Sequence, residues 1–509
     1  MLEAAQLVYN KFWGKNLNDI LQPVPNYGDL KYFTEEQIVD LKLMRLLYGE
    51  TVLLVREEYD VCYNALKDSN SGGVVVTGQP GIGKTCFLYY LLFRRLSEKK
   101  TVAFQVGDIF FLFQETGVRI LSNSSTQSSI PRGIWALCDY TVVIAIPCPT
   151  FLAASTMGNA WIVQTSFPSR SRWSKWLKDQ KGYLVWMEAF SKKEISAIGL
   201  IKRLDVERLC KNYDLWGPSA RTCMSLMDGG QLEDYKRSVE SAADKFTRDV
   251  GQFADLDDMS VSHRLLVLLP CKTRRTVTAT LASDHVLGFV FRAYAKRDLA
   301  ARQRFYQMIS RYYPWLCASA RYIFETGVLL WFRYSPTEDL LSCDPALDWY
   351  PELKIPACRE NMVFFSKPEA LNHVDNLKLP FCLVSVSETS AAVVAIVLTE
   401  DFVITVQMTI ASKHDAKSIG FEKIYEGLPP KFLEARTWCH VFLTDTEDKA
   451  ISLREQRLDD VVEKLIETPI YFYSAFFNVD ELASILTAER AEKLNDDIAA
   501  ATEKMDTSE

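Results

Sequence analysis

One eight-residue segment constrains the fold of this chain more than any other. Residues 78–85 read Gly-Gln-Pro-Gly-Ile-Gly-Lys-Thr, the pattern of a phosphate-binding loop. An apolar, β-branched run precedes the segment at Gly72–Thr77, and a run with helical apolar faces follows it at Cys86–Leu92. Because such a loop joins a buried strand to a helix, this context predicts an α/β fold built on a mainly parallel sheet.

The residues of the loop predict a nucleoside triphosphate, expected to be ATP, as the ligand. Glycines allow successive N–H groups to turn toward one phosphate, and the following helix adds the positive end of its dipole. Lys84 is expected to reach the β- and γ-phosphates, and the Thr85 hydroxyl to bind Mg²⁺. A chance match in a turn is the alternative. The expected nucleotide-binding residues are Gly78, Gln79, Pro80, Gly81, Ile82, Gly83, Lys84, Thr85 and Cys86.

Polar residues at the ends of two later strands extend the predicted site. The run Trp135–Asp139 places the carboxylate of Asp139 at a strand tip, where it can hold Mg²⁺. Thr165 and Ser166 end another apolar run, and Thr165 or Ser166 is expected to contact the γ-phosphate. Tyr140 stands where hydrolytic relatives often carry a water-activating Glu, so slow hydrolysis is expected. For Asp139, an ordinary turn aspartate is the alternative.

A helical segment after the core predicts a lid. Ser191 has Glu194 three residues on, which is the spacing of a capping box at a helix start. Further along, Trp216–Arg221 begins another helix, and Arg221 is expected to reach the phosphates from the lid. A solvated arginine in a first helical turn is the alternative for that residue.

Five segments are predicted from the patterning of 509 residues, a length that suggests two to four domains. They are an N-terminal helical flank at 1–70, a P-loop NTPase core at 71–190, a helical lid at 191–254, a second α/β domain at 259–486 and a helical or disordered tail at 487–509. The expected core strands are Val74–Thr77, Thr101–Val106, Ile134–Cys138, Trp161–Ser166 and Tyr183–Trp186, with a hairpin formed by Ile109–Gln114 and Gly117–Leu121. The acidic run Asp255–Asp258 is interpreted as a linker.

Composition narrows the partners of the chain. A net charge of −7 gives no global field to attract nucleic acid, so such a partner, which stays open, needs a local basic segment such as 169–175 or 271–275. The 12 cysteines include no Cys-x-x-Cys pair, so zinc is not expected. No apolar run reaches the roughly 18 residues of a membrane span, and the N-terminus lacks a signal-peptide pattern. We therefore expect an intracellular protein, cytoplasmic or nuclear, without a membrane partner.

Four stretches carry a resemblance to a known family. Val74–Tyr90, Phe113–Val118, Trp135–Leu137 and Tyr213–Arg221 resemble the Crinkler and retrotransposon-hot-spot (RHS) type proteins of mushroom-forming basidiomycete fungi. That resemblance implies an AAA/STAND-like P-loop ATPase in the N-terminal half and a restriction-endonuclease-like domain in the C-terminal half. Crinkler effectors often carry a Leu-Phe-Leu-Ala-Lys-like string, and this sequence contains none, which argues against an effector role.

The implied nuclease site of the PD-(D/E)XK type matches only in part. It requires a helix acid, an Asp on one strand and Glu/Gln-x-Lys on the next. Glu325 suits the helix acid and Gln407 the second strand, but Thr409 replaces the Lys and Ala391–Leu398 has no carboxylate. Residues that can substitute from nearby are Glu388, Lys413 and Lys417. A domain that has kept the fold and lost cleavage is therefore the leading interpretation.

The motifs and the resemblance leave three functions open. The first is an ATP-binding, ATP-hydrolysing switch that controls a nuclease-like C-terminal domain. The second is an ATP-gated, Mg²⁺-dependent nuclease for DNA or RNA, and the third is a non-catalytic interaction protein that binds ATP structurally. A homo-oligomer stays open, and Arg170 or Arg172 is the residue that such an assembly would donate to a neighbouring site.

Overall fold

The structure is a computed structural model that divides into two compact units, Met1–Phe289 and Val290–Glu509. Each unit is considered by itself. The described residues are 2–34, 36–37, 52–67, 73–106, 109–121, 131, 133–139, 160–169, 172–249, 263–311, 317–336, 338–359, 361–365, 378–385, 395–410, 428–430, 436–454, 470–477, 482, 485–487, 489–490, 493–494 and 496–498. Within these residues, no helix combines the length and apolarity that a membrane crossing requires.

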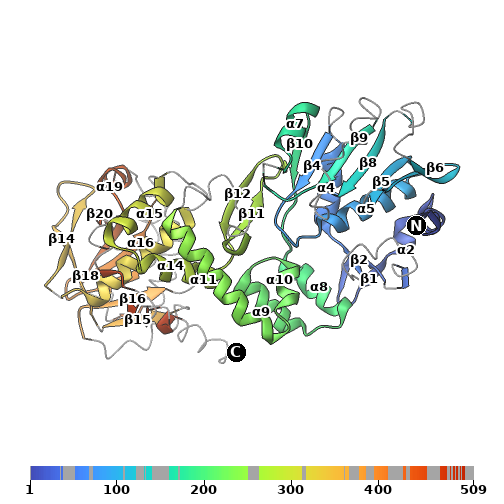
Figure 1. Ribbon diagram of the computed structural model, residues 1–509. Coiled ribbons are helices and arrows are strands. Elements are labelled where there is room, and N and C mark those ends of the chain that lie inside the picture. Colours follow the sequence, from blue (N-terminus) through green and yellow to red (C-terminus); the bar gives the residue numbers. More distant parts are fainter. Residues whose placement is uncertain are drawn as a thin grey trace. The chain divides into compact units, whose positions relative to one another are not determined.

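A seven-stranded sheet forms the centre of the first unit (Figure 1). Its order is β10-β4-β9-β8-β5-β6-β7, with parallel pairing from β10 to β5 and antiparallel pairing from β5 to β7. The strands are β4 (Gly73–Thr77), β5 (Val102–Val106), β6 (Ile109–Gln114), β7 (Gly117–Leu121), β8 (Ile134–Asp139), β9 (Ala160–Thr165) and β10 (Tyr183–Trp186). Each run predicted as a core strand forms one, and the predicted β6–β7 hairpin is confirmed.

The strand β4 lies inside this sheet because both of its faces are apolar. Val74 and Val76 belong to the core on the side of α5 (Lys84–Ser97), whereas Val75 belongs to a second core that includes Trp176 of α7 (Ser174–Gln180). All five residues of β4 are buried. Helices thus cover the two faces of the sheet, and the loop after β4 leaves the sheet at its carboxyl edge.

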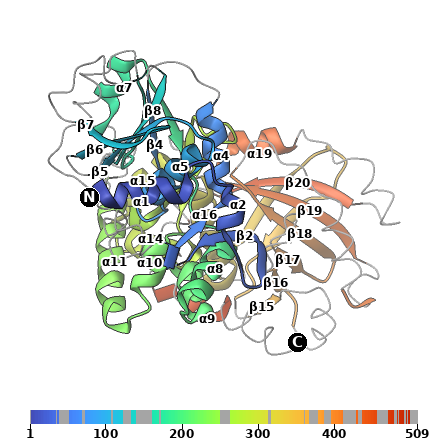
Figure 2. The same ribbon diagram turned by 90° about the vertical axis from the view of Figure 1, so that its right-hand side faces the viewer.

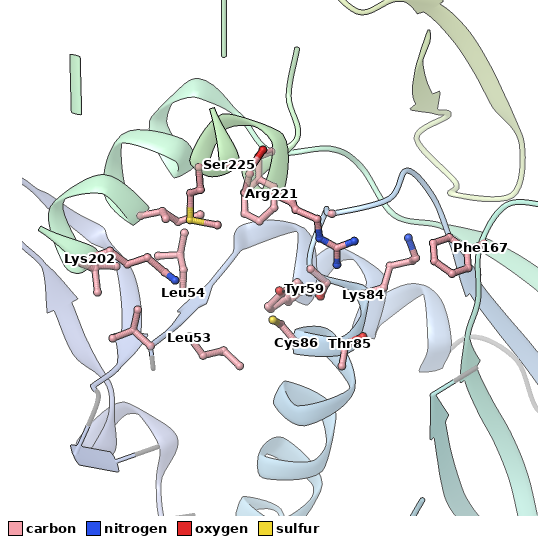
Figure 3. A pocket seen from close by; sticks show the side chains of 18 residues that line it. Leu53, Leu54, Tyr59, Lys84, Thr85, Cys86, Phe167, Lys202, Arg221 and Ser225 are labelled. Carbon is pink, nitrogen blue, oxygen red and sulfur yellow. Dashed lines mark hydrogen bonds between the residues drawn. The ribbon is translucent and has the colours of Figure 1, made fainter. Parts of the chain in front are cut away.

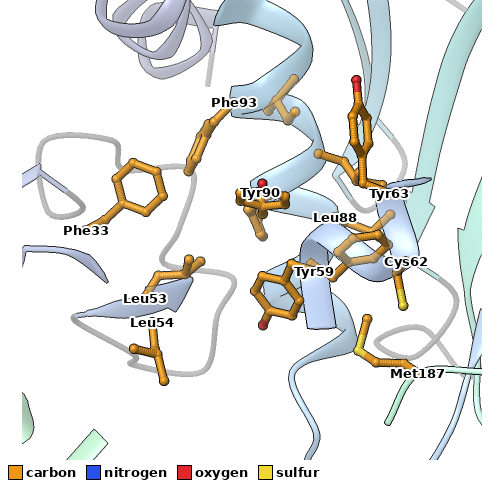
Figure 4. Packing of buried hydrophobic residues seen from close by; sticks show 14 of the residues in the cluster. Phe33, Leu53, Leu54, Tyr59, Cys62, Tyr63, Leu88, Tyr90, Phe93 and Met187 are labelled. Carbon is orange, nitrogen blue, oxygen red and sulfur yellow. The ribbon is translucent and has the colours of Figure 1, made fainter. Parts of the chain in front are cut away.

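The N-terminal flank contains a small sheet as well as helices, which corrects the prediction of a helical flank. Its elements are α1 (Leu2–Phe12), α2 (Leu17–Ile20), β1 (Gln22–Val24), β2 (Tyr27–Phe33), β3 (Leu53–Val55) and α4 (Glu57–Lys67). Strand β2 buries Leu30 and Phe33, and the Phe33 ring contacts Phe93 of α5 at a centroid distance of 5.2 Å (Figure 4). Burial of these side chains against α5 favours strands in this flank.

A helical lid follows β10, as predicted. It consists of α8 (Lys192–Lys202), α9 (Val206–Trp216), α10 (Ala220–Ser225), a 3₁₀ turn η4 (Gly229–Gln231) and α11 (Leu232–Arg248). The capping box at the start of α8 is confirmed, since Glu194 N donates to Ser191 Oγ at 3.2 Å and Ser191 N donates to Glu194 Oε2 at 2.8 Å. The predicted linker 255–258 lies outside the described residues.

The hairpin of β11 (Leu266–Pro270) and β12 (Val277–Leu281) belongs to the first unit. The sequence predicts that this hairpin begins a C-terminal domain at residue 259. In the structure, the boundary between the two units lies at 289–290 instead. Long-range hydrogen bonds explain the difference: Gln79 binds the backbone of β11, and Arg274 in the hairpin turn binds Glu58 of α4. Sequence patterning does not reveal such contacts.

The second unit contains a mixed eight-stranded sheet, with the order β14-β13-β20-β19-β18-β17-β16-β15 (Figure 2). Its strands are β13 (Leu340–Pro345), β14 (Leu353–Pro356), β15 (Met362–Phe365), β16 (Phe381–Ser385), β17 (Ala395–Leu398), β18 (Phe402–Met408), β19 (Thr437–Thr444) and β20 (Ile470–Phe476). The helices are α14 (Asp284–Ala295), which begins in the first unit, α15 (Leu299–Arg311), α16 (Cys317–Tyr334) and α19 (Glu447–Arg454). The mixed α/β character predicted for this half is therefore present. Most of the predicted tail 487–509 lies outside the described residues.

Candidate functional site

The loop between β4 and α5 adopts a backbone that needs glycine at three places. Gly78, Gly81 and Gly83 have φ values of 146°, 79° and 87°, which lie in the region that L side chains rarely adopt. Space is also restricted, because a Cβ on Gly81 would lie 2.7 Å from the Oγ of Ser219 in the lid. The glycines of the predicted motif therefore allow both the loop conformation and its close approach to the lid.

Lys84 begins helix α5 and is almost fully buried, with 5% of its surface exposed. Its Nζ donates to the carbonyls of Gly78 at 2.8 Å and Gln79 at 2.7 Å. Burial lowers the pKa of this ammonium to about 7; the Asp139 carboxylate opposes that shift and the Arg221 guanidinium adds to it. An ammonium with such a pKa favours an anionic partner.

Asp139 and Thr165 lie next to each other at the carboxyl ends of β8 and β9. They are paired in register, and Thr165 Oγ1 donates to Asp139 Oδ1 at 2.9 Å. Ser166 follows and is fully buried, with its backbone N–H bonded to the Val76 carbonyl at 3.0 Å. Since β4, β8 and β9 belong to one parallel sheet, their polar ends lie along the same edge as the loop. Tyr140 lies outside the described residues.

Arg221 occupies the first turn of α10, which begins at Ala220. Ser219 caps this helix by accepting from Thr222 N, and its hydroxyl also donates to the Pro80 carbonyl at 3.4 Å. The predicted lid is thus bonded directly to the loop between β4 and α5. The Arg221 side chain is exposed and lines the same cavity as Lys84.

A cavity of about 720 Å³ is lined by Lys84 and Arg221 (Figure 3), and its volume is typical of small-molecule sites. Asp139, Thr165 and Ser166 are not part of its lining. Lys84, Thr85 and Arg221 lie at one end of it, and Phe167 stands beside Lys84. The rest of the lining is mainly apolar and comes from residues 52–54, from the lid, and from Tyr59, Cys86 and Phe190. The aliphatic residues of that part are Val52, Leu53, Leu54, Ile198, Ile201 and Met224, and Lys202 and Ser225 add polar groups. The cavity therefore has a charged end and an aliphatic end.

Arg56 is a site-forming residue that the sequence patterning did not single out. It is 1% exposed and forms a double hydrogen bond with Glu194 of the lid, at 3.0 and 3.1 Å. It also donates to the Ile82 carbonyl in the loop at 2.8 Å and to the Ala189 carbonyl at 2.7 Å. A bidentate Arg–carboxylate pair fixes geometry strongly, so Arg56 ties the loop to helix α8. Its position directly after an apolar strand is the one signal in the sequence.

The site residues suit Mg²⁺ that is held jointly with phosphate oxygens. Across the described part of the chain, no group of three or more His, Cys, Asp or Glu residues can hold a metal ion. Mg²⁺ typically takes one or two protein oxygens and completes its shell with water and substrate phosphates. Thr85 lines the cavity and Asp139 acts electrostatically on Lys84, so a hydroxyl and a carboxylate of this chain fit such a shared site.

The expected nuclease residues of the second unit do not form a metal site in the described part of the chain. Glu325 forms an ion pair at 2.5 Å with Arg321 of its own helix α16, and burial raises its pKa. Gln407 is buried in β18 at 1% exposure, Thr409 follows that strand, and the described residues of β17 are all apolar. Outside the described residues lie the substitutes Glu388, Lys413 and Lys417.

The basic segments proposed for nucleic acid are partly engaged within the first unit. Arg274 binds Glu58 at 2.6 Å and Glu188 at 2.7 Å, and Arg275 lies 3.6 Å over the ring of Tyr183. Arg172 lies 4.8 Å over the Phe167 ring. The other expected oligomer arginine, Arg170, is outside the described residues.

Comparison with known proteins gives a partial likeness. Crinkler effector proteins 15 and 16 of Phytophthora infestans, an oomycete, are each 30% identical over 154 residues, which is 29% of this chain. The match covers 24% of the length of each relative. The Crinkler resemblance is thus supported for part of the chain, through oomycete rather than fungal proteins. No family model matches the sequence.

Among solved structures, the RuvB Holliday junction branch migration motor of Thermotoga maritima is 13% identical. The aligned region covers 34% of this chain and 58% of that chain, with a TM-score of 0.21. A TM-score this low does not establish a shared fold.

Proposed function

We propose that this chain is a P-loop ATPase of the AAA/STAND-like kind that binds ATP with Mg²⁺, hydrolyses it slowly and acts as a switch. One observation carries the proposal: a single cavity holds Lys84, Thr85 and Arg221 at one end and aliphatic side chains at the other. This division matches the chemistry of a nucleotide, which has a polyanionic tail and an aromatic base whose flat faces are apolar. The depressed pKa of Lys84 supports it, because phosphate would restore the favourable charge.

Each polar residue of the site has a distinct role in this proposal. Lys84 Nζ would exchange its two carbonyl partners for phosphate oxygens, and Arg221 would add a second positive charge from the lid. Thr85 and Asp139 would hold Mg²⁺, which would neutralise phosphate charge when bound. Thr165 fixes the orientation of the Asp139 carboxylate through their hydrogen bond. With Tyr140 following Asp139 in place of a Glu, slow turnover is expected.

The lid gives the switch its moving part in this proposal. Helix α8 is bonded through Glu194 to Arg56, and Arg56 is bonded to the loop at Ile82. A displacement of the loop on nucleotide binding would therefore be passed to the lid through a buried ion pair. Control of the nuclease-like second unit is the output that we propose for this movement.

The proposal is tested by Lys84→Ala. Loss of a charge-assisted contact to a polyanion should weaken the binding of a fluorescent ATP analogue by about 100-fold or more. Phosphate release should fall with it. Lys178→Ala, which removes an exposed lysine of α7 away from the cavity lining, is the matched control and should bind as the unaltered protein does. Equal affinity in Lys84→Ala would refute nucleotide binding at this loop.

Phosphate release also separates the remaining hypotheses. ATP binding without any release would favour a structural role for the nucleotide. Measurement with and without DNA or RNA tests the nuclease alternative, which predicts Mg²⁺-dependent cleavage that is lost in Glu325→Ala or Gln407→Ala. The ion pair of Glu325 with Arg321 and the burial of Gln407 do not favour that alternative.

A further inference from the structure

The side chain of Gln79, inside the phosphate-binding loop, is bonded to the backbone of β11. Its Nε2 donates to the carbonyls of Leu266 at 2.5 Å and His263 at 3.3 Å, and its Oε1 accepts from Leu268 N at 3.0 Å. An amide side chain has two donor hydrogens and one acceptor oxygen, so these bonds use every group it has. Phosphate binding uses the backbone of such a loop and gives this side chain no role.

The backbone carbonyl of Gln79 is bonded to Lys84. Lys84 Nζ donates to the Gln79 carbonyl at 2.7 Å and to the Gly78 carbonyl at 2.8 Å. A lysine that turns to a phosphate gives up these partners, and the buried Gln79 carbonyl then loses its donor. Because an unsatisfied buried carbonyl is costly, the Gln79 peptide is expected to reorient. Two arrangements of Gln79 follow, one with Lys84 bonded to its carbonyl and one with Lys84 bonded to phosphate.

The hairpin is also fastened at its turn and at its exit. Arg274 in the turn donates to Glu58 of α4 and to Glu188, and its carbonyl accepts from Trp186 N at 2.9 Å. Beyond β12, Ser283 Oγ donates to the Leu215 carbonyl of the lid at 2.5 Å. The chain then enters α14, which begins at Asp284 and runs into the second unit. The hairpin thus connects the loop, the lid and the start of the second unit along one stretch of chain.

We propose that the β11–β12 hairpin senses the occupancy of the phosphate-binding loop through the side chain of Gln79. This inference rests on the proposed nucleotide binding and identifies its first relay. Nucleotide that draws Lys84 away from the Gln79 carbonyl weakens the hold of the amide on β11. Linkage requires the converse as well, so a loosened hairpin changes nucleotide affinity by the same factor, which for allosteric couplings is about 5- to 150-fold.

Hydrogen exchange in the full-length chain tests the proposal. Amide exchange of peptides within 263–283 is measured with and without a slowly hydrolysed ATP analogue and Mg²⁺, and binding is measured separately by titration. The N–H of Leu268 donates to Gln79 Oε1. We expect this amide to exchange about fivefold faster or more when the analogue is bound. Unchanged or slower exchange in the liganded protein overturns the proposal. Absence of binding overturns the proposed function together with it.

Two variants separate sensing from simple stability. Gln79→Ala, measured at analogue concentrations that saturate this variant, should give fast exchange in the hairpin whether or not nucleotide is bound. Thr278→Val removes a hydrogen bond to the Leu269 carbonyl within the hairpin and leaves Gln79 in place. It should raise the basal exchange and keep the response to nucleotide. A response that persists in Gln79→Ala, or one that disappears in Thr278→Val, contradicts a specific role for the amide.

Discussion

The carboxyl edges of the parallel strands differ between the two units, although polar residues end the strands in both. In the first unit, Asp139 and Arg221 each act electrostatically on Lys84, and Lys84 and Arg221 share a cavity. In the second unit, Asp445 follows β19 and is neutralised locally: Lys449 lies 2.6 Å and the Tyr306 hydroxyl 3.0 Å from its carboxylate oxygens. Charges kept apart around a cavity are typical of a binding site, whereas charges paired within the fold compensate one another and are not open to a ligand.

Parallel strand topology alone does not form a binding site. Both sheets have parallel strands whose ends are polar, and a rule based on strand ends selects both. Among the described residues, only the first unit adds a glycine-dependent loop, which leaves the ammonium of Lys84 bonded to carbonyls instead of a carboxylate. That ammonium is available to a ligand. The predictions below test this contrast, in order of expected effect.

Asp139→Asn should show the largest functional difference between the carboxyl edges of the two sheets. Replacing the carboxylate removes a Mg²⁺ ligand while keeping an acceptor for Thr165, so phosphate release should fall about 100-fold. The measurement is Mg²⁺-dependent phosphate release under saturating ATP. Asp445→Asn in the second unit is the matched control and should leave phosphate release unchanged. An Asp139→Asn protein with normal turnover would remove this residue from the site.

Lys449→Ala should lower the stability of the fold without changing the affinity for nucleotide. It leaves Asp445, whose side chain is 2% exposed, without its ammonium partner. We expect the free energy of unfolding to fall by about 2 kcal/mol, the scale of hydrogen bonds to charged groups. Urea denaturation measures this change, and titration with the ATP analogue should show unchanged affinity. A loss of affinity in this variant would mean that the two edges are not functionally separate.

Nucleotide affinity should depend on pH through Lys84. Its pKa in the ligand-free protein is about 7, and a bound polyphosphate raises it, so binding takes up a proton above pH 7. The dissociation constant should be flat below that pH and rise by at most about tenfold per unit above it. Calorimetry in two buffers of different ionisation heat measures the proton uptake. Lys84→Arg, whose guanidinium stays charged, should show no uptake, and an unaltered protein without uptake would contradict this account of Lys84.

Arg221→Ala should have the smallest effect of the set. This side chain is exposed at the cavity, so solvent screens its charge and affinity should fall only about fivefold. Titration in low and moderate salt measures the change, and the difference between the two proteins should shrink as salt increases. An effect as large as that of Lys84→Ala would place Arg221 inside the closed site.

Much of the candidate site was predictable because its information is local in sequence. The loop Gly78–Thr85 lies between its own strand and helix, and Asp139 and Thr165 were recognisable as polar ends of apolar runs. Their mutual hydrogen bond follows once β8 and β9 are neighbours. The capping box at Ser191 depends on residues three positions apart. Such local patterns predict position well.

The unpredicted features depend on contacts between distant parts of the chain. Arg56 reaches Glu194 across 138 positions, and Gln79 reaches Leu266 across 187. In the sequence, nothing distinguishes Arg56 or Gln79 from an arginine or a glutamine that is exposed to solvent. Strand β13 is a further example, since its position between β14 and β20 depends on pairing with a segment distant in sequence. The place of the hairpin in the first unit has the same origin.

The buried position of Arg56 decides which part of the chain can bind nucleotide by itself. A shortened chain that begins at residue 71 would retain the whole loop and α5, yet it would lack the partner of Glu194. A buried carboxylate would then stand unpaired in the lid, and the Ile82 and Ala189 carbonyls would lose their donor. The loop motif alone therefore does not define an autonomous nucleotide-binding module. Any engineered nucleotide-binding fragment would have to keep the N-terminal flank together with the motif.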